Sequence, residues 1–514
     1  MANIEAQRSD PSIKEAPSPV VEERRDSRTE ITDKDPIAKA TLGFAFPTAK
    51  KWWILTVIFW VQISMNYNAA IYANAVPGMA KEFGITPFQA RLGQMAFLVA
   101  YGFGCEFWAP FSEELGRKWI MQVSLGLVNL FQLPCMLSTG FGTVLAGRIM
   151  GGLSSAGGSV TLGMVADMFG PEDQQFAMLY VVFSSCAGSV VAPIIGGFMT
   201  QYADWRWVFY SQLIFGAVVQ LAHLIIVPET RATVLLDREA QRRRKSGEEP
   251  DVYGPREIRG NFWQRLDCKH VLRLMWRPYQ FLLTEPVVAF LSLLSGFSDA
   301  LIFTGLDSFA LVLSKWNFTP SQVGLSFVSL LLGYVLSCLF FIPFYINDRR
   351  AMRAAGGEHG IKPERRMKGL LWLILLEPIG LAAFGATSLG PPEVHWIAPL
   401  IFVTMIGIAN LAIYQATCDY MVAAYGEYSA SATGGNGFCR DFLAGIAALY
   451  ATPLYSNIKP GTKWQLPIPS FMLAAFAVPL VIAPYIFYFH GEWFRSRSKY
   501  ASQLAEKRAE EKEN

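Results

Sequence analysis

Five ionisable side chains lie inside or beside long apolar runs, and they are the residues of this chain best placed to do chemistry. They are Glu106, Arg148, Asp299, Asp307 and Glu377. Charge inside a bilayer is costly, so such residues usually face a cavity or a partner and serve the movement of ions or substrates. A carboxyl group that is alternately desolvated and hydrated can bind and release a proton. The five residues are therefore predicted candidates for proton coupling or gating.

Asp299 and Asp307 belong to one apolar run, 281–312. On a helix they would lie about 80° apart around the axis and roughly 12 Å apart along it, so both could line one broad face. We expect Asp299 or Asp307 to face a central cavity. The alternative for Asp307 is a position near the outer end of the helix, capped by Ser308 and water.

The other acids each leave two possibilities open. Glu377 precedes Pro378, which frees a backbone carbonyl in mid-run, and the acid could face a cavity or not. Glu106 lies at the inner end of its run, where a water-exposed position competes with a proton-handling one. Arg440 and Asp441 are neighbours and would point about 100° apart, so we expect them to meet other helices rather than each other.

The loop 109–118 places acids before a glycine and bases after it. Glu113, Gly116, Arg117 and Lys118 would bring opposite charges to adjacent helix ends, where they can pair with each other or with helix dipoles. We interpret the string as a latch. The alternative is an ordinary basic loop, which suffices for Lys118 alone.

Two further runs combine small residues with one disruptive residue. Residues 145–158 are rich in glycine, alanine and serine, which permits close helix approach, yet they contain Arg148. A gating role for Arg148 and a packing role are both open. In the next run Pro193 removes a backbone hydrogen bond beside Gly188, Gly196 and Gly197, which predicts a helix kink suited to a hinge or a sealing contact.

Amide and aromatic side chains in the apolar runs could line a substrate pocket. The candidates are Asn66, Asn68, Tyr72, Phe303, Tyr334, Tyr414 and Phe438. Interhelical hydrogen bonding is an equal alternative for the amides and Tyr72, and any single aromatic is more often a packing or lipid-facing residue.

The elements that must hold these residues are twelve apolar runs between 52 and 490, each near the roughly 20 residues that cross a bilayer as a helix. Hydrophobic residues are 52% of the chain and charged residues 17%. We predict an all-α membrane protein of two six-helix bundles. The expected parts are a disordered tail (1–51), a first bundle (52–230), a cytoplasmic linker (231–280), a second bundle (281–490) and a charged tail (491–514).

Basic residues are distributed unevenly between the two sides of the predicted bundles. Both tails and the loops on their side carry 36 Lys and Arg residues, and the opposite loops carry five. Positive charge is retained in the cytoplasm, so both termini are expected there. The net charge of +3 gives no support to nucleic-acid binding.

Several strings in order resemble the successive signatures of the major facilitator superfamily, and most closely its fungal twelve-span drug:proton antiporters. They are Ser-Glu-Glu-Leu-Gly-Arg-Lys (112–118), Gly-Arg-Ile-Met-Gly-Gly (147–152), Ala-Pro-Ile-Ile-Gly-Gly (192–197), Asp-Trp-Arg-Trp (204–207) and Pro-Glu-Thr (228–230), with further matches in the second half. The resemblance implies that Arg117 pairs with Asp167 in the latch, that Arg148 is the gating or proton-linked arginine, and that Gly188, Pro193 and Gly197 form the antiporter kink. Glu113 stands where the superfamily has aspartate, and Glu106 where the family has an apolar residue.

The resemblance implies a proton-coupled exporter of small organic compounds such as a drug, toxin or secondary metabolite, working by alternating access. An organic-acid or polyamine exporter is the alternative, and a non-transporting membrane sensor is the alternative of another class. We expect no enzyme activity and no cofactor, with the proton gradient as energy source. The expected state is a monomer in the plasma membrane, or alternatively the vacuolar membrane, with a small-molecule substrate, protons and lipid as its partners.

Overall fold

The computed structural model describes residues 29–32, 35–258, 268–355, 362–498, 500 and 502. The chain begins there with β1 (Thr29–Glu30), α1 (Pro36–Thr41) and η1 (Gly43–Ala45). The first large group, called the N half below, comprises α2 (Thr48–Phe83), α3 (Pro87–Leu115), α4 (Arg117–Leu130), α5 (Gln132–Met136), α6 (Phe141–Leu153), α7 (Gly157–Met168), α8 (Pro171–Tyr202) and α9 (Trp207–Ile226).

A connecting region and a second large group follow. The connection holds α10 (Ala232–Ser246), β2 (Val252–Tyr253), α11 (Pro255–Ile258) and α13 (Cys268–Thr284). The second group, called the C half, comprises α14 (Pro286–Leu313), η2 (Ser314–Trp316), α15 (Pro320–Ser326), α16 (Val328–Ala354), η4 (Pro363–Met367), α17 (Lys368–Leu373), α18 (Leu376–Thr387), α19 (Ile397–Tyr425), η5 (Gly426–Tyr428), α20 (Ser429–Asn457) and α21 (Pro467–Arg497).

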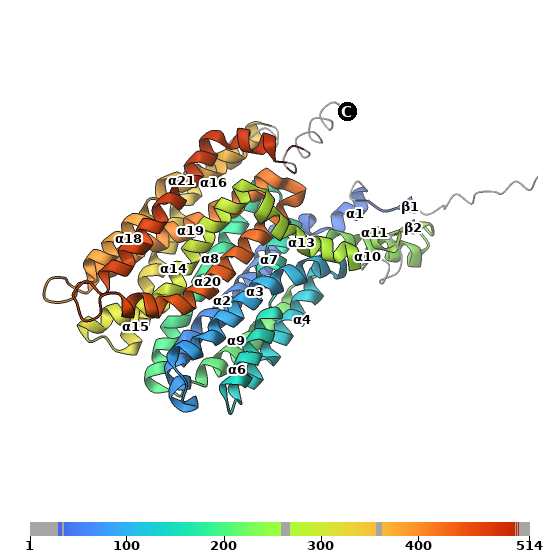
Figure 1. The fold of residues 1–514 in the computed structure, drawn as a ribbon. Coiled ribbons are helices and arrows are strands. Elements are labelled where there is room, and N and C mark those ends of the chain that lie inside the picture. Colours follow the sequence, from blue (N-terminus) through green and yellow to red (C-terminus); the bar gives the residue numbers. More distant parts are fainter. Residues whose placement is uncertain are drawn as a thin grey trace, which may run out of the picture.

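The two halves form two helix bundles that lie side by side (Figure 1). Each half has six long rods, because α4 continues into α5, α6 into α7, α15 into α16 and α17 into α18. Across the boundary, α3 packs against α20, and α8 packs against α15, α16 and α19. The predicted all-α fold with two six-helix bundles is confirmed.

In the described residues, ten of the twelve rods are long and apolar enough to cross a membrane by composition alone. The two that fall short are α3 and α20, which pack against each other between the halves. Both carry ionisable residues in mid-helix, Glu106 on α3 and Arg440 with Asp441 on α20. The two rods that fall short are thus covered in part by the opposite half.

Several of the predicted apolar runs contain breaks that the apolar pattern did not indicate, and two of them have a clear physical cause. Run 142–167 divides between α6 and α7, where the Ser124 hydroxyl accepts from the Ala156 N–H at 2.9 Å and donates to the Ser154 carbonyl at 2.7 Å. Run 369–387 divides between α17 and α18. Pro378 explains the second break, since it has no N–H to donate to the carbonyl four residues earlier.

The expectation that all of 1–51 is disordered is wrong from Thr29 onward. β1 pairs in parallel with β2, with Thr29 opposite Val252 and Glu30 opposite Tyr253. The reason is a small apolar cluster that joins Ile31, Ala38 and Leu42 to residues of α10 and β2. The part of the expected tail at 1–28 lies outside the described residues, as does most of 498–514.

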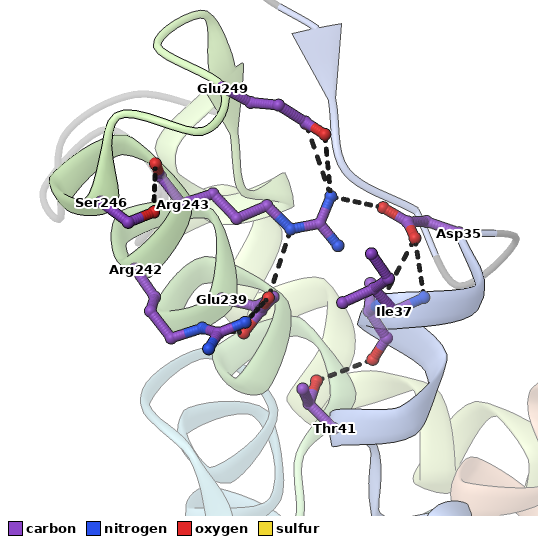
Figure 2. A network of polar contacts seen from close by, with 9 residues as sticks. Asp35, Ile37, Thr41, Glu239, Arg242, Arg243, Ser246 and Glu249 are labelled. Atoms are coloured by element: carbon purple, nitrogen blue, oxygen red, sulfur yellow. Dashed lines mark hydrogen bonds and ion pairs between the residues drawn. The ribbon is translucent and has the colours of Figure 1, made fainter.

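Charged side chains fix this segment onto the connecting region (Figure 2). Arg243 of α10 lies 2.6 Å from the Asp35 carboxylate and 3.2 Å from that of Glu239. The nearby guanidinium lowers the pKa of Asp35, which also caps the first turn of α1 by accepting from the N–H of Ile37 at 2.9 Å. The end of the bundle that carries β1, α1 and α10 is called the tail end below, and the opposite end the far end.

Candidate functional site

A cavity of about 120 Å³ lies between the two halves. Its walls come from α2, α3, the start of α4, α7 and α8 of the N half and from α19 and α20 of the C half. Five charged side chains reach it, and they are Glu106, Glu113, Arg117, Arg440 and Asp441. Such a cavity, apolar in large part with a few convergent polar groups, is the usual form of a small-molecule site.

Arg440 is the central cation of the cavity wall. Its guanidinium donates to the Asp299 carboxylate of α14 at 3.0 Å and lies 3.5 Å from the centre of the Tyr414 ring. Asp299 therefore reaches the cavity only through Arg440, which neutralises it. As expected from their angular separation, Arg440 and Asp441 are not hydrogen-bonded to each other in the described structure, and Arg440 meets another helix.

Besides Glu113 at the end of α3, the cavity has two acids without a matched cation, Glu106 and Asp441. Among the described residues, neither carboxylate makes a hydrogen bond or an ion pair. Glu106 is only 4% exposed and lies close to Gly434, where a Cβ atom would come within 2.7 Å of its Oε1. Of the two possibilities for Glu106, the structure places it in the cavity wall. Sequence reasoning did not assign Asp441 to the cavity, although an acid beside Arg440 in an apolar run was the available signal.

Asp307 is not in this cavity, so the expectation of a cavity-facing position does not hold for it. It lies in the far-end part of α14 and forms an ion pair at 2.6 Å with Arg91 at the start of α3. The alternative, a position near the outer end of the helix, describes its location. Its partner there is the positively charged Arg91, and this ion pair joins the two halves.

Glycines also bring the halves into backbone contact, between α8 and α15. A Cβ atom on Gly197 of α8 would lie 2.5 Å from the Pro320 carbonyl oxygen of α15, and one on Gly324 would lie 2.5 Å from the Pro193 carbonyl oxygen. Gly188 and Gly196 instead accommodate Asn66 and Asn74 of α2. Pro193 lies inside the continuous helix α8, whose glycines serve close packing at these positions.

The loop between α3 and α4 holds several charged groups in fixed positions. Arg117 donates to Asp167 of α7 at 3.1 Å and to the Ser112 hydroxyl at 2.6 Å, so the pairing implied by the resemblance is present. Glu229 accepts from the backbone N–H groups of Arg117 at 2.9 Å and Lys118 at 3.3 Å.

Gly116 has φ 102°, and a Cβ atom on it would lie 2.4 Å from the Glu229 carboxylate. The Glu113 side chain faces the cavity, and the Lys118 ammonium donates to the Leu224 carbonyl at 3.0 Å. Sequence reasoning noted the string that contains Glu229 but gave that residue no part in the latch.

The C half bears a related arrangement that sequence reasoning missed. Asp419 of α19 is completely buried, accepts from Arg366 of η4, and accepts at 2.7 Å from Gln175 of α8 in the other half. Glu172 and Asp173, also on α8, pair with Arg353 and Arg349 of α16 at 2.7 and 3.1 Å. The halves are therefore bridged by polar contacts at the tail end as well as at the far end.

Arg148 lies within the N half and does not line the cavity. It is 1% exposed, donates to the Asn68 side-chain oxygen at 2.7 Å and to the Asn68 carbonyl at 3.2 Å, and has its guanidinium 3.9 Å from the centre of the Phe97 ring. No carboxylate of the described residues pairs with it. These contacts occupy Asn68, while the Tyr72 hydroxyl donates to the Ala90 carbonyl at 2.8 Å. Neither Asn68 nor Tyr72 lines the cavity, which corrects their assignment as lining residues.

Of the remaining lining candidates, Asn66 and Tyr414 do reach the cavity. Phe303 and Tyr334 are buried in the apolar core instead. Phe438 packs against Phe103, with ring centres 5.0 Å apart. These three aromatic side chains pack between helices. The sequence does not show how each helix is rotated about its axis, so it cannot distinguish a packing aromatic from one that lines the pocket.

Glu377 is also outside the cavity. It is fully buried in the first turn of α18, within the C half. Among the described residues there is no group of three or more His, Cys, Asp or Glu side chains arranged to hold a metal ion.

Comparison with known proteins identifies the family. The family model described as Major Facilitator Superfamily matches residues 58–449. The chain belongs to the major facilitator superfamily. It is a multi-pass membrane transporter and not an enzyme, and its fold supports transport by alternating access.

Individual relatives agree with this assignment. The chain is 29% identical over 469 residues to the MFS transporter paaT of Penicillium rubens, covering 90% of this chain and 82% of that one. It is 31% identical over 399 residues to the efflux pump atB of Aspergillus terreus, covering 76% of this chain and 81% of that one. Among solved structures, the proton:xylose symporter XylE shares the fold with a TM-score of 0.60 at 12% identity, over 86% of this chain and 96% of that one.

Proposed function

We propose that this transporter exports small organic compounds in exchange for protons. The observation that carries the proposal is the pair of acids in the cavity wall, Glu106 and Asp441, which have no cation of their own. An acid in such a site binds a proton when the cavity is dehydrated and releases it when water or a cationic group enters. The direction of transport is supported by relatives named as efflux pumps, among them atB and FUBT of Fusarium oxysporum.

The contacts at the two ends provide the elements of alternating access. Opening the cavity toward the far end requires separation of Arg91 from Asp307 and of Gly197 from Gly324. Opening it toward the tail end requires separation of Gln175 from Asp419 and of Arg353 from Glu172. Each set bridges the halves, so only one needs to break at a time for the bundles to rock about the cavity.

The charges of the cavity favour neutral or cationic substrates over organic acids. Both arginines are already paired, Arg440 with Asp299 and Arg117 with Asp167, whereas Glu106 and Asp441 are not. An organic anion would find no free cation among the described cavity residues. A polyamine is thus the second candidate substrate, because its positively charged amines need two acids in the same cavity.

We further propose that the protein is a monomer in the plasma membrane with the tail end in the cytoplasm. The excess of Lys and Arg residues on that side supports this orientation. The vacuolar membrane is the alternative location.

The experiment is an accumulation and sensitivity screen in cells that lack or overproduce the protein, across drugs, polyamines and organic acids, with and without a protonophore. We expect overproduction to lower accumulation of a neutral or cationic compound, and the protonophore to abolish that effect. Export that persists without a proton gradient would contradict proton coupling. A sensor without transport would leave accumulation of every compound unchanged.

A further inference from the structure

The C half contains a buried polar site that the cavity does not explain. Glu377 is 0% exposed, and neither of its carboxyl oxygens has a hydrogen-bond partner of normal geometry in the described residues. The side chain that faces it is Ser298 of α14. Asn410 of α19 donates to the Ser298 hydroxyl at 3.1 Å, and the Asn410 side-chain oxygen is itself unpartnered and buried. Three helices thus place three buried polar groups together.

No charge within the described residues is available to neutralise an ionised Glu377. On α14 the neighbouring Asp299 is turned to Arg440, and on α19 Asp419 is held by Arg366 and Gln175. On α21, which also packs against α18, the Tyr485 hydroxyl donates to the Leu371 carbonyl. A buried carboxylate with a hydroxyl beside it but no cation is very costly in such surroundings, so the acid form is the stable one.

The acid form fits the groups around it. A protonated carboxyl group has one O–H donor and keeps an acceptor oxygen; the Asn410 side-chain oxygen can accept, and the Ser298 hydroxyl can accept or donate. Ser295, one turn from Ser298 on the same helix, adds another buried hydroxyl without a partner. The cluster can therefore accept a hydrogen bond from protonated Glu377, but it contains no positive charge to neutralise the Glu377 carboxylate.

We propose that Glu377, Ser298 and Asn410 form an occluded proton-binding site in the C half, separate from the cavity, with Glu377 as the proton carrier. Ser298 precedes Asp299 in α14, so a movement of α14 that separates Asp299 from Arg440 also displaces the hydroxyl that faces Glu377. Such a movement changes the groups that surround the Glu377 carboxyl group and allows its proton to leave. The role in transport rests on the proposed proton coupling, whereas the protonation of Glu377 does not.

Infrared spectroscopy of the full chain in lipid nanodiscs tests the protonation directly, since the carbonyl stretch of a neutral carboxyl group is separate from that of a carboxylate. We expect a neutral-carboxyl band at neutral pH in the wild type that Glu377→Gln removes and Ser298→Ala shifts in frequency. Glu106→Gln, which changes a cavity acid, is the matched control and should leave this band in place. Thermal melting of each variant confirms that it is folded.

Two results would overturn the proposal. A Glu377→Gln spectrum with the whole neutral-carboxyl band retained would show that Glu377 is not the proton carrier. A band that is present in choline buffer and absent in sodium buffer at the same pH would identify a sodium site instead. Both measurements use protein that is not transporting, so they stand whether or not a protonophore stops export in cells.

The transport role has its own readout. Once a substrate is known, Glu377→Gln is expected to keep substrate exchange across vesicles at equal pH while losing acceleration by a pH gradient. Equal acceleration in the variant and the wild type would exclude Glu377 from coupling.

Discussion

Asp307→Asn should open the far end of the transporter. Asp307 and Arg91 are 10% and 13% exposed, and their ion pair joins α14 to α3 across the halves. Two unit charges about 4 Å apart interact by roughly 4 kcal/mol at an effective dielectric constant near 20. Much of this offsets desolvation, so we expect the closed far end to lose about 1–3 kcal/mol. Since 1.4 kcal/mol corresponds to a factor of ten, the ratio of open to closed far ends should rise roughly 5- to 150-fold.

The assay is the distance distribution between two spin labels, on cysteines replacing Phe88 at the start of α3 and Lys463 before α21, in a chain without its native cysteines. Asp307→Asn should add or enlarge a long-distance population. The double variant Arg91→Gln with Asp307→Asn should shift the ratio by less than the sum of the single variants, since the second change removes a charge that the first left unpaired. Unchanged distributions, or strictly additive shifts, would refute the idea that this ion pair holds the far end closed.

Three further predictions concern the latch, Arg148 and the tail segment. Gly116→Ala should destabilise the protein by about 1–3 kcal/mol, because Gly116 has φ 102° and lies close to Glu229. The midpoint of thermal unfolding should therefore fall. Gly140→Ala, at a glycine in open space, is the control and should change the midpoint little. Arg148→Met should lower the free energy of unfolding by about 2–4 kcal/mol, since it leaves buried oxygens of Asn68 without a donor. Unfolding in detergent measures this change. An unchanged unfolding midpoint would indicate that Arg148 acts in gating alone.

The tail contact should depend on pH. Because Arg243 lowers the pKa of Asp35 in the folded state, the contribution of the pair is present above the unfolded pKa near 3.8 and is lost as pH falls through the lower folded value. Hydrogen exchange of 35–45 should accordingly accelerate in Asp35→Asn at neutral pH, and equal protection in the variant and the wild type would show that the apolar cluster alone holds this segment.

The fold was largely predictable because the bilayer constrains whole segments of the chain: it sets the length of each apolar run and the side on which basic residues lie. The same averaging hid the break at Ser154, where a single hydroxyl from Ser124 replaces helix hydrogen bonds. The tail was misjudged for a related reason. Its polar composition suggested disorder, yet Ile31, Ala38 and Leu42 suffice to cover an apolar face of the connecting region.

The site was only partly predictable, because facing a cavity is a property of helix rotation and of the opposite half. Glu106 and Tyr414 could be named from residue type alone. The separate positions of Asp299 and Asp307 depend on Arg440 and Arg91, which come from helices distant in sequence. No spacing within one run indicates such partners.

The most direct test of the central claim is proton movement in liposomes that contain the purified transporter and an internal pH dye, with a substrate found by the cell screen. Adding substrate should move protons in the direction opposite to the substrate in the wild type. Glu106→Gln with Asp441→Asn should abolish that proton movement while the protein stays folded and inserted. Substrate transport with no proton movement in the wild type, or undiminished proton movement in the double variant, would contradict the account.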